Sequence, residues 1–309
     1  MTRQRAILIA GPTASGKSSL ALALAERLAG TVINADSMQV YRELHILTAR
    51  PTPEDEARAP HALYGFTSGA QAYSAGRYAV DAAKTISEAH SAGRVPIVVG
   101  GTGLYFKAML EGLSPVPATD PDVRAYWREQ ARVRPAPELH AVLAQRDPET
   151  AARLMPTDPQ RIVRALEVLE STGRSLSDWQ KQPGEAVLRE AQTVRLLVLP
   201  ERATQGVRID TRFDAMIAAG VVEEVRALAA LGYSPELPLM RAHGVPALVA
   251  HLAGLLTLDE AAAAAKADTR HYAKRQLTWL RRNMISWKGL SQQQTERMMA
   301  GNLSEIDLR

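Results

Sequence analysis

The feature that most constrains this chain is a glycine-rich loop close to its amino-terminal end. Residues 11–18, Gly-Pro-Thr-Ala-Ser-Gly-Lys-Ser, match the pattern G-x-x-x-x-G-K-[ST] at every fixed position. The apolar residues 6–10 before the loop are typical of a buried strand, and the Ala- and Leu-rich residues 19–28 after it are typical of a helix. This strand–loop–helix order predicts a P-loop NTPase-like α/β fold, in which helices flank a parallel sheet.

A P-loop supplies several kinds of group that bind anions. Its glycines let the backbone wrap around a phosphate, and consecutive N–H groups and the following helix N-terminus point at it. Lys17 adds a positive charge, and the hydroxyl of Ser18 can ligate Mg²⁺, the cofactor we expect. The loop predicts a diphosphate or triphosphate ligand without deciding between them. The loop residues predicted to bind it are Gly11, Thr13, Ala14, Ser15, Gly16, Lys17 and Ser18.

Composition excludes several classes of protein. No apolar run approaches the roughly 18 residues of a membrane-spanning helix, so we expect no membrane partner. The chain has no cysteine, which excludes disulfides and thiolate zinc sites and fits a cytoplasmic location. The formal net charge of +4 is mild, and it permits a polyanionic partner without requiring one.

Two further strand ends should lie beside the P-loop. Residues 31–35 read as a strand that ends on Asp36, and residues 95–99 read as a strand that runs into a second glycine turn, Gly-Gly-Thr-Gly at 100–103. Ligands of open parallel sheets bind at the carboxyl ends of strands, so both segments should approach the phosphate. Asp36 could ligate Mg²⁺, cap the following backbone or accept a proton. The strand at 95–99 lacks the acidic end of a Walker-B element, and no convincing candidate occurs elsewhere, which counts against ATP hydrolysis.

The middle of the chain reads as an insertion. Residues 113–121 contain three prolines and are typical of a linker, and the pattern is then helical until a strand at 194–199. We therefore predict an inserted all-helical domain at residues 114–192. The P-loop core would comprise residues 1–113 and 193–288, and residues 289–309 would form a loosely held polar tail.

Two helical stretches carry basic residues at spacings that place them on one face. Arg124, Arg128 and Arg132 are four residues apart, and such a stripe can follow phosphates or simply be solvated. In residues 269–283, Arg270 and Lys274 lie on one face, and Ala273 and Leu280 lie on another. This second pattern predicts a helix that packs against the core on one side and stays basic on the other.

Five segments, taken in order, resemble the tRNA dimethylallyltransferase family: GPTASGKSSLA, INADSMQVYR, VPIVVGGTGLY, DPQRIVRALE and TRHYAKRQLTW. They span residues 6 to about 283, nearly the whole chain. The resemblance implies transfer of the dimethylallyl group from dimethylallyl diphosphate to N6 of the adenine immediately 3′ of the anticodon, with release of diphosphate. It also implies the tRNA anticodon stem-loop as partner. The chain lacks the cysteines of the zinc finger that eukaryotic relatives append, so the bacterial type fits better. We expect a monomer.

The resemblance assigns roles to individual residues. Asp36 would be the base that takes a proton from N6, with Thr102 and Lys17 as the other catalytic residues, and Arg212 would join the P-loop on the diphosphate. The positions that would contact tRNA are Asp36, Ser37, Met38, Gln39, Thr102, Arg124, Gln160, Arg161, Ile162, Val163, Arg164, Arg241, His243, Arg270, Lys274 and Arg275. A surface ion-pair ladder of Arg161 and Arg164 with Glu167 remains the competing interpretation of one of these segments.

The chain also departs from the family pattern at three places. Leu47 begins a segment that usually starts with glycine, Ala62 replaces the second histidine of a pair, and His243 lies in a segment that usually contains Ile-Gly-Tyr. Three other functions stay open on the residues: a P-loop kinase for a small metabolite, a prenyltransferase acting on free adenine nucleotide, and a non-enzymatic RNA-binding module. A P-loop that holds a leaving group needs no Walker-B acid, so the absent motif favours prenyl transfer.

Overall fold

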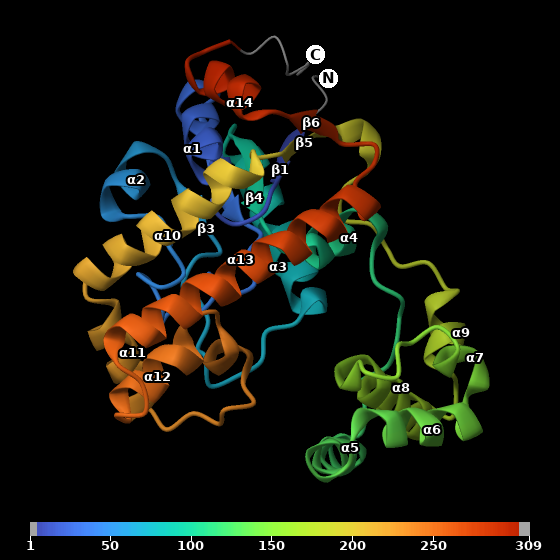
Figure 1. Cartoon of the computed structure of the whole chain (residues 1–309). Helices are drawn as coiled ribbons and strands as arrows, with labels where there is room; N and C mark the ends of the chain where they lie inside the picture. The colour runs from blue at the N-terminus through green and yellow to red at the C-terminus, as the bar shows by residue number, and fades with distance from the viewer. Residues whose placement is uncertain (1–4, 303–309) are drawn as a thin grey trace. The chain divides into compact units, whose positions relative to one another are not determined.

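The computed structural model describes residues 5–302 and divides the chain into two compact units (Figure 1). One unit comprises the residues up to Leu110 together with those from Val187 onward, and the other comprises Glu111–Ala186. The predicted inserted domain therefore exists, but its boundaries lie a few residues before those predicted. The amides of Val187 and Leu188 both bond to the carbonyl of Met109, which fixes the return point within the first unit.

The first unit is built on a six-stranded parallel sheet in the order β3-β2-β4-β1-β5-β6. This confirms the predicted parallel sheet flanked by helices. The strands are β1 (Ala6–Ala10), β2 (Gly30–Asn34), β3 (His61–Ala62), β4 (Val95–Gly100), β5 (Thr193–Val198) and β6 (Lys288–Leu290). The helices of this unit are α1 (Lys17–Arg27), α2 (Pro53–Arg58), α3 (Ala75–Ser91), α4 (Gly103–Glu111), α10 (Arg202–Ala218), α11 (Val221–Ala230), α12 (Val245–Leu252), α13 (Leu258–Asn283) and α14 (Gln292–Met299), with short 3₁₀ turns η1 (Glu190–Gln192) and η2 (Pro238–Arg241).

Alternation along the strands gives the sheet two buried faces. On β1, Ile7 and Ile9 pack with α1 and α14, whereas Leu8 packs with residues of α3, α4 and α10–α13 on the opposite face. All five residues of β1 are buried. A strand covered on both faces reads as a continuous apolar run, which is how residues 6–10 appear in the sequence.

Strand order places three chain segments together at one edge of the sheet. β1 leads into the P-loop and pairs with β4, and β4 also pairs with β2. The amide of Gly11 bonds to the carbonyl of Gly100, and the amide of Thr102 bonds to the carbonyl of Ala35. The P-loop, the Asp36 turn and the second glycine turn are therefore neighbours, as predicted.

The carboxyl-terminal segment corrects a prediction. Residues 289–309 were expected to form a loosely held tail, but β6 extends the sheet beside β5 and α14 packs on the α1 face with Met298 fully buried. Arg27 donates to the carbonyl of Met299 at 2.8 Å and ties α14 to α1. Most residues of α14 are polar and only Thr295 and Met298 are buried, so the composition of this segment does not reveal that it packs on α1. Residues 303–309 lie outside the described part of the chain.

The inserted unit is all-helical: α5 (Pro121–Val133), α6 (Ala136–Arg146), α7 (Pro148–Ala151), α8 (Pro159–Thr172) and α9 (Leu176–Gln180). Its own core contains Trp127, Leu139, Leu143, Ile162 and Leu166. Asp120, Asp147, Asp158 and Ser175 cap its helices through their side chains, and proline begins several of them. Within residues 5–302 no helix is both long and apolar enough to cross a membrane.

Candidate active site

The P-loop is bent around open space at the start of α1. Gly16 is the N-cap of α1 with φ 90°, and no atom lies within 4 Å of the place where its Cβ would be. Ala14 also has a positive φ of 58°. Ser15 is only 4% exposed, and its buried Oγ has no hydrogen-bond partner among the described residues. An open glycine corner and an unpartnered hydroxyl are what a phosphate ligand would require.

Thr13 joins the P-loop to two distant helices. Its amide donates to Oε1 of Gln276 on α13 at 2.9 Å, and its carbonyl accepts from Nε2 of Gln205 on α10 at 2.8 Å. Its hydroxyl accepts from Nη2 of Arg212 at 2.5 Å. The structure thus brings Arg212 to the P-loop, as the resemblance implied. Each polar group of Thr13 thus has a protein partner, so Thr13 holds the loop, and its hydroxyl keeps a proton to donate.

Asp36 and Thr102 lie on adjacent turns. The Asp36 amide bonds to Asn34 Oδ1 at 2.8 Å, and the Met38 amide bonds to Asp36 Oδ1 at 2.9 Å. The Ser37 amide bonds to Thr102 Oγ1 at 2.9 Å, which links the two turns. Asp36 therefore does cap the following backbone, the simpler of its predicted roles. Because Oδ1 makes that bond, Oδ2 is the carboxylate oxygen left to act as a base.

The charges of Lys17, Asp36 and Arg212 act on one another. Burial lowers the pKa of Lys17 to about 8, the carboxylate of Asp36 opposes this, and Arg212 lowers it further. Burial also lowers the pKa of Arg212, again opposed by Asp36. Two partly buried cations face one carboxylate, so the site carries an excess of positive charge that an anion would balance.

The second glycine turn uses its glycines differently from the P-loop. A Cβ on Gly100 would overlap the backbone of Ala35, and one on Gly101 would overlap the side-chain amide of Gln276. A Cβ on Gly103 would overlap the ring of Trp279. Protein atoms therefore fill the space beside these three glycines, and this packing explains why glycine is needed there without reference to a ligand.

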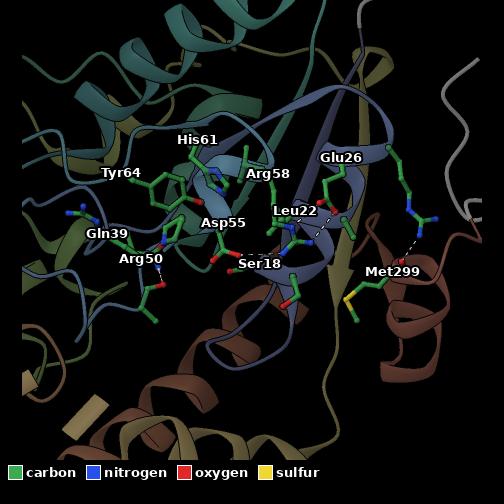
Figure 2. Close-up of a pocket in the computed structure, with 16 residues that line it drawn as sticks. Ser18, Leu22, Glu26, Gln39, Arg50, Asp55, Arg58, His61, Tyr64 and Met299 are labelled. Atoms are coloured by element: carbon green, nitrogen blue, oxygen red, sulfur yellow. Dashed lines mark hydrogen bonds and ion pairs between the residues drawn. The ribbon is translucent and has the colours of Figure 1, made fainter. Parts of the chain in front are cut away.

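Two pockets border α1. The first, of about 390 Å³, begins at Ser18 and contains Arg50, Asp55, His61 and Tyr64 (Figure 2). Its arginines are engaged, since Arg58 pairs with Glu26 at 2.8 Å and Arg50 bonds to the carbonyl of Tyr41 at 3.2 Å. The second, of about 340 Å³, is lined by Ala14, Ser15, Gly16, Ser19, Arg208, Arg212, Gln292, Thr295, Glu296 and Met299.

Comparison with known proteins identifies the family. A family model described as IPP transferase matches residues 39–283, most of the chain, and one described as isopentenyl transferase matches residues 4–62. The chain belongs to the IPP transferase family. The tRNA dimethylallyltransferase of Parvibaculum lavamentivorans is 55% identical to it over 304 residues, which cover 98% of this chain and 96% of the relative. That of Methylocella silvestris is 56% identical over 279 residues, which cover 90% and 92%.

Solved structures of IPP transferases share the fold. The full-length tRNA isopentenylpyrophosphate transferase of Bacillus halodurans superimposes with a TM-score of 0.68 at 31% identity, over 98% of this chain and 96% of that one. A eukaryotic dimethylallyltransferase acting on tRNA superimposes with a TM-score of 0.79 at 26% identity, over 94% and 74%. The resemblance noted in the sequence is confirmed at the level of family and fold.

The metal prediction rests on Ser18 in this IPP transferase. Ser18 is exposed in the first turn of α1, directly after the P-loop lysine. Residues 5–302 contain no cluster of three or more His, Asp or Glu side chains that could hold a metal ion. One hydroxyl combined with phosphate oxygens and water is a donor set that suits Mg²⁺, which seldom uses an all-protein cage. The residues present therefore fit the predicted ion.

The predicted RNA residues of the inserted unit divide into two groups. Arg124, Gln160 and Arg161 are exposed, whereas Ile162 and Val163 are 0% and 8% exposed and pack in that unit's core. The side chains of Ile162 and Val163 are therefore not available to RNA, a correction to the prediction. Helical periodicity explains their burial, because Ile162, Val163 and Leu166 recur at the spacing of one helix face and that face packs in the core.

Ion pairs occupy several arginines of the inserted unit. Arg128 and Arg164 both pair with the buried Glu167, at 3.5 and 3.7 Å, and Arg161 pairs with Asp158 at 3.3 Å. The competing ion-pair interpretation is therefore correct for Arg164, whereas Arg161 pairs with Asp158 and not with Glu167. Arg128 and Arg164 remain partly exposed. Arg124 has no side-chain ion pair or hydrogen bond within the described residues.

The basic residues of the carboxyl-terminal segment also have partners. Arg270 pairs with Asp210, and His243 pairs with Asp268 and lies 4.3 Å from the ring of Tyr272. Lys274 and Arg275 are exposed on α13, and Arg241 donates to the carbonyl of Pro235.

The departures at Leu47 and Ala62 are accommodated locally. Glu224 accepts the amides of His45, Ile46 and Leu47 at 2.7–2.9 Å and holds that turn without a glycine. Ala62 lies in the short edge strand β3. Gln39 lies near this turn and donates to the carbonyls of Thr48 and Ala49.

Two site residues were missed in the sequence. Gln205 and Gln276 are each 6% exposed and hold Thr13. Gln276 carried a usable signal, because it falls between Ala273 and Leu280 on the buried face of its helix, where an amide needs hydrogen-bond partners. Gln205 lies in a segment that gives no such signal.

Proposed function

We propose that this chain is a tRNA dimethylallyltransferase. It transfers the dimethylallyl group of dimethylallyl diphosphate to N6 of the adenine immediately 3′ of the anticodon and releases diphosphate. The observation that carries the proposal is the placement of Lys17 and Arg212 at the P-loop, with Asp36 and Thr102 on the adjacent turns. This arrangement has an anion site and a carboxylate base, and it has no acid at the end of β4 to support ATP hydrolysis.

The P-loop side of the site stabilises the leaving group. The N–H groups at the start of α1, the Lys17 ammonium and the Arg212 guanidinium are already in place and need little reorganisation when the C–O bond of the donor breaks. The buried Ser15 hydroxyl, unpartnered in the ligand-free chain, would donate to a diphosphate oxygen. Ser18 would hold Mg²⁺, which when bound neutralises charge on the diphosphate.

The Asp36 side activates the acceptor. The lone pair of adenine N6 is delocalised into the ring, so N6 attacks carbon poorly unless its proton is removed. Asp36 Oδ2 takes that proton, the N6–carbon bond forms, and the electron pair of the breaking C–O bond leaves with the diphosphate. Thr102 lies beside Asp36 and supports the turn from which this carboxylate projects.

The target adenine of the RNA must be unpaired when it enters this site. An adenine stacked in an anticodon loop has to be flipped out before its N6 meets Asp36. The exposed Arg124, Lys274 and Arg275 are the side chains we assign to the tRNA backbone. We further propose that the enzyme acts in the cytoplasm as a monomer.

One assay tests substrate, donor and reaction together. The full chain is incubated with Mg²⁺, dimethylallyl diphosphate and unmodified tRNA that has adenine 3′ of its anticodon, and the digested nucleosides are examined by mass spectrometry. We expect prenylated adenosine at that position and none in a matched tRNA with guanine there. ATP turnover without prenyl addition would contradict the proposal in favour of a kinase. Prenylation of free adenosine monophosphate but not of tRNA would contradict the assigned acceptor.

A further inference from the structure

We infer that Gln276 is a positioning residue that sets the P-loop and the second glycine turn relative to each other for the transfer reaction. The inference rests on the proposed function. Gln276 itself lies behind the two turns, bonded to their backbone, and acts on the reaction through them.

The Gln276 side chain bridges the two turns with its two ends. Its Oε1 accepts the Thr13 amide of the P-loop at 2.9 Å, and its Nε2 donates to the Gly101 carbonyl at 3.0 Å. Both bonds join segments far apart in sequence, and the side chain is 6% exposed. A buried amide whose two ends are engaged in this way has one orientation, because flipping it would place two donors or two acceptors face to face.

The surrounding packing is adapted to this bridge. A Cβ on Gly101 would overlap Nε2 of Gln276, so glycine is required at that position for the amide to reach the carbonyl. One turn further along α13, Trp279 occupies the space beside Gly103 in the same manner. The α13 face that carries Gln276 and Trp279 therefore fits against the turn that presents Thr102.

The two turns carry different parts of the reaction. The P-loop holds the leaving group, and the Gly101 turn carries Thr102, which bonds to the Ser37 amide directly after Asp36. Gln276 is a direct side-chain connection between them. Displacing either turn changes the distance between the leaving group and the base, and misplacement of about 1 Å can lower a rate by about 100-fold.

Gln205 provides the matched control. It is buried to the same extent and also holds Thr13, but within residues 5–302 its side chain bonds to the carbonyl of that residue and makes no hydrogen bond to the Gly101 turn. Replacing either glutamine by leucine leaves buried backbone groups of the P-loop unpaired, so both changes should weaken the P-loop. Only the change at Gln276 also releases the second turn.

The test measures kcat and the donor KM for Gln276→Leu and Gln205→Leu in the tRNA assay, with the thermal midpoint of each. We expect kcat of Gln276→Leu to fall by about 30- to 100-fold, and that of Gln205→Leu by less than about fivefold, with similar rises in donor KM. Equal kcat losses in the two variants would overturn the inference. No transfer by the wild-type chain would instead remove the proposed function and the inference with it.

A second variant removes the ambiguity of a poorly folded protein. Gln276→Glu keeps an acceptor for the Thr13 amide, but its carboxylate repels the Gly101 carbonyl until it is protonated. The ratio of its kcat to that of the wild type should therefore rise as the pH falls, by about threefold or more between pH 8 and pH 6. A ratio that does not change with pH would overturn the inference. Gly101→Ala should reproduce the loss of Gln276→Leu, and the double variant should lose no more than either one alone.

Discussion

The two glycine turns at neighbouring strand ends look alike in sequence and serve opposite purposes. At Gly16 the glycine has a left-handed backbone and open space where a side chain would stand. At Gly101 and Gly103 the space belongs to Gln276 and Trp279 of α13. A glycine therefore marks a place that a Cβ cannot occupy, and only the fold decides whether a ligand or the protein fills it.

The contrast assigns a task to each turn. The P-loop is held through Thr13 by Gln276, Gln205 and Arg212, and its Gly16 corner faces open space. The second turn is packed against α13 and presents Thr102 beside the Asp36 turn. The rate of transfer should then depend on Asp36 beside the second turn, and the stability of the fold should depend on the packing of the second turn against α13.

The largest expected effect comes from Asp36, which follows β2, the strand next to β4. Asp36→Asn keeps a group that accepts the Met38 amide but cannot take the N6 proton, so we expect kcat to fall by about 100- to 10,000-fold. Donor affinity should change little or increase, since a negative charge beside the anion site is lost. Single-turnover transfer together with calorimetry of diphosphate binding separates the two quantities. Full activity in this variant would mean that a group other than Asp36 removes the N6 proton.

The next effect separates the two turns by stability. Gly103→Ala forces a methyl group into the Trp279 ring, and we expect it to lower the free energy of unfolding by about 3 kcal/mol. Gly16→Ala introduces no clash, and its only cost is the positive φ that alanine must adopt. We expect it to lower the free energy of unfolding by about 1 kcal/mol. Urea unfolding of both variants measures the difference. If the two losses are equal, the distinction between an open and a filled turn is wrong.

A smaller effect follows from the charge at the P-loop. Lys17 has a pKa of about 8, and anion binding requires its charged form. As the pH rises above about 8 the ammonium deprotonates, so affinity for Mg²⁺-diphosphate should fall, approaching tenfold per pH unit. Calorimetry from pH 7 to pH 9 measures this fall. Lys17→Arg keeps its charge throughout, so it should show only the titration of the ligand itself, and identical profiles would refute the role of Lys17.

How far the sequence predicts this site depends on the kind of interaction. The P-loop and Asp36 were predictable, because strand ends and local backbone geometry follow from short patterns. The bridge by Gln276 was not, since Thr13 lies 263 residues away and only the fold brings the two together. Periodicity could have separated Ile162 from Arg161, because Ile162, Val163 and Leu166 recur at helical spacing, but the resemblance assigned the whole segment to RNA. The β6–α14 segment was missed because only the fold brings it to β5 and α1.

The arginines of the inserted unit repeat the contrast between the turns, and they give the smallest expected effect. Arg124 and Arg128 share one stripe on α5, yet Arg128 pairs with the buried Glu167 and Arg124 has no such pair in the described chain. Arg124→Ala should weaken tRNA binding by about three- to tenfold and reduce the salt dependence by about one counterion, because a free guanidinium is available to a phosphate.

Arg128→Ala is the matched control, with the same change one turn away. It leaves Glu167 with Arg164 alone, so it should lower the thermal midpoint while tRNA affinity stays within about twofold. Filter binding at several salt concentrations, with thermal unfolding of both variants, distinguishes them. Equal losses of affinity would mean that the ion pair with Glu167 opens when RNA binds. Arg124 and Arg128 would then both bind RNA, and an arginine that pairs with a carboxylate in the free protein could still contact a phosphate in the complex.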